Sequence, residues 1–172
     1  MQLLRTGLSD RELASSLFAL CLQADAAFGG EFVDAAASYG YTIHVPEDAI
    51  DHGELLIALV WLVQWISRSR PGLVHALGGH YLSAVTSLPY FGNRTDRQAL
   101  ERFFIDRTHH YDSLVERSAQ GLDLIEVAYE MSKYALRNWF EVQHHLPRVE
   151  IVVAHLLTQW VVSVTQTVKE LS

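Results

Sequence analysis

The chain has 172 residues, of which 49% are hydrophobic and 19% charged, a balance typical of a globular protein rather than a disordered one. Its formal net charge is −7 and it has no block of basic residues, which argues against binding to nucleic acid phosphates. Its single cysteine, Cys21, excludes an intramolecular disulfide and a zinc site built from several thiolates.

The two longest apolar segments, residues 55–66 and 151–168, were tested as membrane spans. The first is shorter than the roughly 20 residues that a bilayer requires, and the second carries seven polar residues. We therefore expect buried helices and no membrane insertion. The N-terminus MQLLRTGLSD lacks the features of a secretory signal, so we expect a cytoplasmic protein. The 11 arginines against 2 lysines indicate a GC-rich bacterial genome.

Local signals predict two helices in the first 40 residues. Ser9 and Glu12 form a candidate capping box that starts a helix running to about Phe28. The pair Gly29–Gly30 is expected to break that helix. A second, short helix then ends at Gly40, a residue suited to a C-terminal cap. The segment 41–45 is β-prone but has no second strand to pair with, so it is predicted to be an extended connector.

Proline and capping signals divide the rest of the chain into five further helices. Pro46 opens a helix that reaches Arg68, with a pause near Gly53. Pro71 starts the next helix, which ends near residue 87, and Thr95 with Gln98 forms a second candidate capping box. The last three helices are predicted at about 95–120, 122–145 and 147–172.

These elements predict an all-α, single-domain helical bundle of about seven helices spanning residues 1–172. Residues 1–45 could instead form an N-terminal arm packed on a 46–172 bundle. Two helices, about 54–67 and 148–170, are apolar on nearly every side. Helices of this kind lie at the centre of a bundle or at a subunit interface. The sequence therefore predicts a homodimer or a bound partner chain.

Two histidine motifs were considered as metal ligands. Asp106-x-x-His109 and Glu141-x-x-His144 each place a carboxylate and an imidazole on one helical face, as in di-iron bundles. Counted from the turn at Gly121, however, the two histidines lie roughly 18 Å apart along the helix axes. The helical wheel also places them on polar faces. We therefore predict surface histidines and no metal site, and a metal-dependent oxidase is a weaker alternative.

A smaller set of residues remains as a candidate site. Arg107 lies about 30° from the centre of the apolar face of its helix, where an arginine needs a partner. Counting residues from the connecting turns places His80 and Trp61 at the same level of the bundle. Trp65 and Tyr111 lie one helical turn away. The alternative is that Arg107 pairs with a surface acid or across a dimer interface, while His80 is a hydrogen-bonded core residue.

These residues suggest a pocket for a small anionic or polar ligand. Arg107, Trp61 and Trp65 would bind it, since a guanidinium holds carboxylates with two parallel hydrogen bonds. His80 could act as an acid or base, with Tyr111 beside it. We therefore predict a small-molecule-binding bundle, with an enzyme or enzyme subunit of bacterial specialised metabolism left open. The alternative is a non-catalytic interaction protein. The sequence identifies no cofactor.

Overall fold

The computed structural model describes residues 8–42, 50–85, 87, 97–117, 124–138 and 149–171. Within these ranges the chain forms helices and no strand, which confirms the predicted all-α fold. The six helices are α1 (Asp10–Ser38), α2 (His52–Ile66), α3 (Pro71–Ala84), α4 (Arg97–Arg117), α5 (Leu124–Asn138) and α6 (Val149–Leu171).

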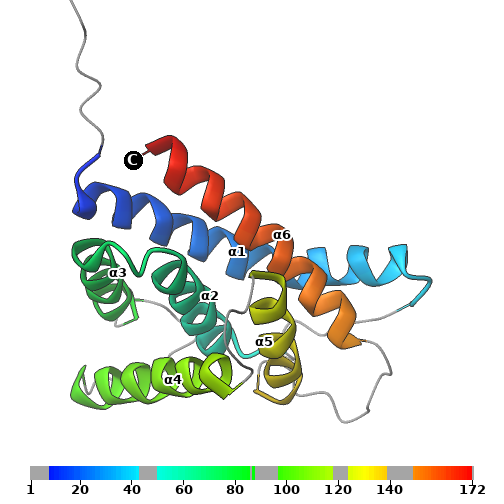
Figure 1. Ribbon diagram of the computed structural model, residues 1–172. Helices are drawn as coiled ribbons and strands as arrows, with labels where there is room; N and C mark the ends of the chain where they lie inside the picture. The colour runs from blue at the N-terminus through cyan, green and yellow to red at the C-terminus, as the bar shows by residue number, and fades with distance from the viewer. Residues whose placement is uncertain are drawn as a thin grey trace, which may run out of the picture.

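Helix α2 is the centre of the bundle. It packs against α1, α3, α4 and α6, and every residue from Gly53 to Val63 is buried. Figure 1 shows α1 and α6 crossing above α2, while α3, α4 and α5 lie around and below it. The side chain of Asp51 caps the helix by accepting from the backbone N–H of Glu54 at 3.1 Å. The sequence predicted that this apolar helix lies at the centre of the bundle or at a subunit interface, and the structure places it at the centre.

The prediction of two helices before Gly40 is wrong, because α1 continues through Gly29 and Gly30. Two glycines in a helix interior cost roughly 2 kcal/mol relative to alanine. Phe28 precedes the two glycines and Phe32 follows them. Their rings are buried and stacked on each other, and this packing offsets the cost. A side chain at Gly29 would meet Ile50 at 3.2 Å, so the glycine also allows Ile50 to approach closely. The described part of the chain therefore has six helices rather than about seven.

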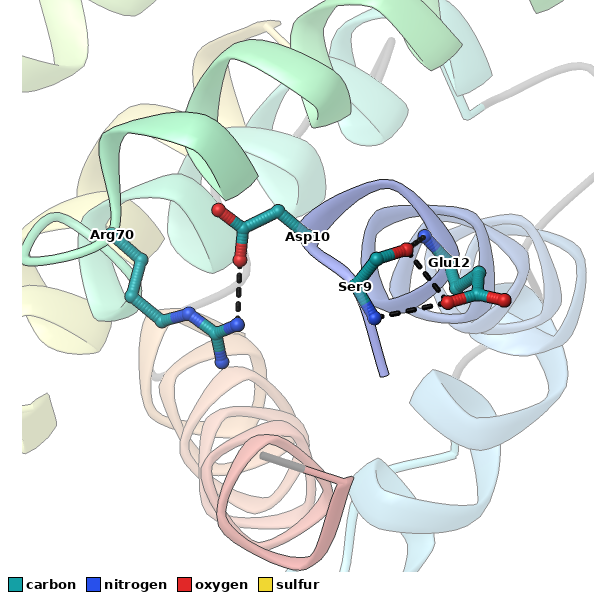
Figure 2. Close-up of polar contacts among 4 residues, drawn as sticks. All are labelled: Ser9, Asp10, Glu12 and Arg70. Carbon is teal, nitrogen blue, oxygen red and sulfur yellow. Dashed lines mark hydrogen bonds and ion pairs between the residues drawn. The ribbon is translucent and has the colours of Figure 1, made fainter. Parts of the chain in front are cut away.

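Both ends of α1 follow the sequence signals. The Ser9 hydroxyl accepts from the Glu12 backbone N–H, and the Glu12 carboxylate accepts from the Ser9 backbone N–H, so the predicted capping box is present (Figure 2). Bonding to Ser9 lowers the pKa of Glu12. At the other end Gly40 has φ +81°, and the N–H groups of Gly40 and Tyr41 bond to the carbonyls of Ala37 and Ala36. This arrangement is a Schellman motif.

An ion pair joins the beginnings of α1 and α3. The Arg70 guanidinium donates to the Asp10 carboxylate, as Figure 2 shows. A Cβ atom at Gly72 would lie 2.3 Å from the Asp10 carboxylate, so any larger residue there would make the Asp10 side chain shift. Further along α1, Cys21 is fully buried. Burial raises the pKa of its thiol far above the ordinary value.

Helix α6 differs from α2 because it buries only one face. Its buried residues follow helical spacing and face α5 and α1; they are Val152, Val153, Leu156, Leu157, Val161 and Val164. Ile151 and Val162 are 45% and 58% exposed. By length and composition alone, α1 and the Glu150–Leu171 segment could cross a membrane, a test that core helices of soluble proteins also pass. The prediction of no membrane insertion stays a prediction.

Several sequence predictions lie outside the described residues. These are the connector after Thr42, the helix start at Pro46, the Thr95 end of the second capping box and the segment that contains His144. The single-domain organisation and the alternative N-terminal arm also stay predictions. Helix α1 packs against α2, α3 and α6.

Candidate functional site: a cleft between α2, α3 and α4

Arg107 finds its partners on α2 and α5. Its Nε lies 2.6 Å from Oε1 of Glu54, a carboxylate whose side chain is only 5% exposed. Its Nη1 donates to the Tyr134 hydroxyl at 2.8 Å, and its guanidinium lies 5.1 Å from the ring centroid of Phe103. The partner acid is therefore buried within the same chain, so these two guanidinium nitrogens are already engaged by the protein.

Aromatic rings surround this ion pair. Tyr134 lies 4.4 Å from the ring of His110 and 5.4 Å from that of Tyr111, measured between centroids. Loss of solvent raises the pKa of Tyr134, although the nearby Arg107 charge opposes the shift. Tyr111 is fully buried and also contacts Trp61 at 5.5 Å. Tyr111 is therefore a core residue that links the ion pair to the tryptophans.

His80 faces a different part of the bundle. Its ring stacks on Phe18 of α1, with centroids 6.1 Å apart and ring planes 19° apart. Arg107, in contrast, contacts α2 and α5. The structure thus places the predicted acid–base residue and the predicted anion-binding residue in separate contacts.

A second buried acid also pairs with a group on α2. Asp25 of α1 is 1% exposed, and its Oδ1 lies 3.1 Å from Nδ1 of His52. His52 and Glu54 both lie in the first turn of α2. The start of this helix is therefore fixed to α1 by one polar contact and to α4 by another.

The other end of α2 borders an open cleft of about 620 Å³, shared with α3 and α4. Its apolar lining consists of Trp61, Trp65, Pro71, Val74 and Val115. The two indoles stack with centroids 6.4 Å apart and planes 28° apart. Trp61 is 2% exposed and Trp65 is partly exposed, so they form an aromatic floor at two depths.

Polar groups surround this floor: Gln64, Arg68, His75, Thr108, Asp112 and Glu116. The Trp61 indole N–H donates to Oδ1 of Asp112 at 2.8 Å. Gln64 donates to the carbonyl of Val74 at 3.0 Å, which fixes the distance between α2 and α3. The Arg68 guanidinium lies over the Trp65 ring, 4.8 Å from its centroid. The cleft thus combines an aromatic surface with a guanidinium, an imidazole and carboxylates at its rim.

Two of the five predicted site residues, Trp61 and Trp65, line this cleft, while Arg107, Tyr111 and His80 do not. Sequence reasoning missed Arg68, His75, Asp112 and Glu116. Thr108, Asp112 and Glu116 recur at i, i+4 and i+8, so they share one helical face with a polar character. That spacing was the one signal available, and it is also typical of a solvated surface.

For the metal alternative, the structure concerns the described residues alone. Among them there is no group of three or more histidine, cysteine, aspartate or glutamate side chains placed to hold a metal ion. Asp106 and His109 are both exposed. The second motif, with Glu141 and His144, lies outside the described ranges.

Comparison with protein-family models, with curated proteins and with solved structures finds no match for this chain.

Proposed function

We propose that the protein binds a small molecule in the cleft between α2, α3 and α4. The observation that carries this proposal is the pair of stacked tryptophans, buried Trp61 and partly exposed Trp65, that lines a cleft of about 620 Å³. Small-molecule sites are concave, have volumes of about 300–1,000 Å³ and combine apolar surface with a few polar groups. The cleft meets each of these criteria.

Small-molecule binding is also the function that the sequence predicted, but the proposed site is the cleft and not the surroundings of Arg107 and His80. Trp61 and Trp65 remain ligand-binding residues. Arg107 is instead assigned a structural role, because Glu54 and Tyr134 bind its guanidinium. His80 is assigned to the contact between α3 and α1.

Binding of a panel of small aromatic compounds, measured by ligand-observed NMR, tests this proposal. Trp65→Ala should weaken binding about tenfold, because it removes the exposed part of the aromatic floor. Trp160→Ala is the matched control, since Trp160 is also partly buried but lies on α6 and does not line the cleft. Equal losses in the two variants, or no binding to the wild type, would contradict the proposal.

A second candidate function is assembly with another chain through α6. The observation that favours it is the exposure of Ile151 and Val162 on the outer face of that helix. Val162→Glu should then lower the mass measured by light scattering after size exclusion. Ser163→Glu, at an exposed polar neighbour, is the control. A wild-type protein that is monomeric at high concentration would argue against self-association.

A further inference from the structure

We infer that the ligand of this cleft is dipolar: a small zwitterion with a flat apolar body, a carboxylate-like anionic group and an ammonium-like cationic group. This inference rests on the proposed function, and it specifies the chemical class of the ligand. It is carried by the position of the Arg68 guanidinium on the α2–α3 side of the cleft and of two carboxylates, Asp112 and Glu116, on the α4 side.

The tryptophans account for the flat apolar body. The indole of Trp65 is partly exposed, and the deeper indole of Trp61 is oriented by its hydrogen bond to Asp112. Val74 and Val115 extend the apolar surface from α3 and α4. An aromatic ring stacked on this floor would gain both apolar burial and ring–ring contact.

The α2–α3 side accounts for the anionic group. Arg68 follows the end of α2, and His75 lies one turn into α3. Within the described ranges Arg68 contacts the face of Trp65 and forms no ion pair with a carboxylate. Contact with the indole occupies no N–H donor in an ion pair, and the planar guanidinium presents a fork of donors that suits a carboxylate.

The α4 side accounts for the cationic group. Asp112 and Glu116 are exposed and lie four residues apart, so their carboxylates are neighbours on one helical face. Asp112 already accepts the indole N–H of Trp61, but a carboxylate has capacity for further donors. In the described part of the chain Glu116 belongs to no ion pair.

The positive side chain and the negative side chains lie on different helices around the cleft, and this separation favours a zwitterion over a singly charged ligand. A simple anion would satisfy Arg68 but leave the two carboxylates without a cation and would be repelled by them. A simple cation could bind the two carboxylates but would be repelled by Arg68. The chain's net charge of −7 adds long-range repulsion for anions, which a neutral dipolar molecule avoids. A molecule with both charges satisfies both sides.

Four compounds with one indole body separate these possibilities: L-tryptophan, tryptamine, indole-3-propionate and 3-methylindole. They are zwitterionic, cationic, anionic and neutral. Their dissociation constants should be measured by NMR titration of the full chain at pH 7. L-tryptophan should bind about fivefold tighter than either singly charged compound, since each rim charge is solvent-exposed and contributes modestly. 3-Methylindole, which has neither charged group, should also bind more weakly than L-tryptophan.

Two charge-removing variants test which side of the cleft binds the anionic group of the ligand and which binds the cationic group. Arg68→Gln should weaken L-tryptophan and indole-3-propionate about fivefold and leave tryptamine unchanged or tighter. Glu116→Gln should weaken L-tryptophan and tryptamine but not indole-3-propionate. Arg102→Gln and Glu101→Gln are the controls, because both residues are exposed on α4 and neither lines the cleft.

The inference is overturned if L-tryptophan binds no tighter than tryptamine and indole-3-propionate, or if none of the four compounds binds. Loss of 3-methylindole binding in Trp65→Ala would still support a small-molecule site even where charge has no effect. Failure of the charge preference can therefore be distinguished from failure of the proposed function.

Discussion

The two ends of α2 use polar residues in opposite ways. At its start, His52 and Glu54 pair with Asp25 and Arg107 in contacts of 3.1 and 2.6 Å, and both acids are buried. Near its end, Arg68 lies at the rim of an open cleft and is exposed. A polar group that is buried and paired fixes how helices meet, whereas one at a cleft stays available to a ligand. The comparison predicts that changes at the start will cost stability and changes at the end will cost binding.

The largest effect should come from Glu54→Ala, which leaves Arg107 without its buried carboxylate. We expect the free energy of unfolding in urea to fall by about 3 kcal/mol, the lower end for a broken buried pair because Arg107 is partly exposed. The double variant Glu54→Met with Arg107→Met should recover part of this loss. If the single variant lost less than about 1 kcal/mol, the pair would not be a structural anchor.

A smaller loss of stability is expected from Asp112→Ala. Asp112 lines the cleft and also accepts a hydrogen bond from the buried Trp61. The substitution removes the acceptor of the Trp61 N–H, a bond to a charged group that contributes about 1.5 kcal/mol. Unfolding should be monitored by tryptophan fluorescence, whose emission should also shift as Trp61 loses its partner. Asp106→Ala, at an exposed position on the same helix, should leave both stability and emission unchanged.

Tyr134→Phe should cost about 1 kcal/mol at pH 7, because it removes the acceptor of Arg107. Its pH dependence gives the sharper test. The pKa of Tyr134 is raised above 10.0, so between that pH and the folded-state pKa the unfolded chain has released a proton that the folded chain keeps. Wild-type stability should therefore fall as the pH rises above 10, and the gap to the variant should narrow. A constant gap would contradict the shift.

The smallest effect on stability should follow Arg68→Gln. Its cation–π contact with Trp65 is solvent-exposed and contributes at most about 0.5–1 kcal/mol. We expect the melting temperature to change by less than about 3 °C, given how little such free energies shift melting in a chain of this size. A large loss of stability would place Arg68 among the structural residues and remove the contrast between the two ends of α2.

Local signals predicted the parts of the fold that depend on local geometry. The capping box at Ser9 and the glycine cap at Gly40 are hydrogen-bonding patterns within a few residues, and both are present. The expected break at Gly29 is absent because packing of distant residues, including Ile50, outweighs helix propensity. Helix propensity is a property of each residue type and does not include such a contact between distant residues.

The candidate site was predicted only in part for a related reason. Counting residues along helices placed Trp61 and Trp65 at a useful level, and both line the cleft. Which residue lies opposite Arg107 depends on how far each helix is rotated about its axis, and the sequence does not determine that rotation. The signal for its partner was a lone acid, Glu54, at the start of an otherwise apolar helix. Exposed residues such as His75 carry no periodic signal that separates a cleft from an ordinary surface.

Cys21, the chain's one thiol, is fully buried on α1, a helix that packs against α2, α3 and α6, and its pKa is raised. A protonated, inaccessible thiol cannot attack a disulfide reagent, so it reacts only in molecules in which α1 has come away. The rate at which a chromogenic aromatic disulfide modifies the thiol would then report local opening of the bundle. A ligand that stabilises the bundle would slow that rate without having to touch the thiol, so the native cysteine is a built-in reporter of ligand binding.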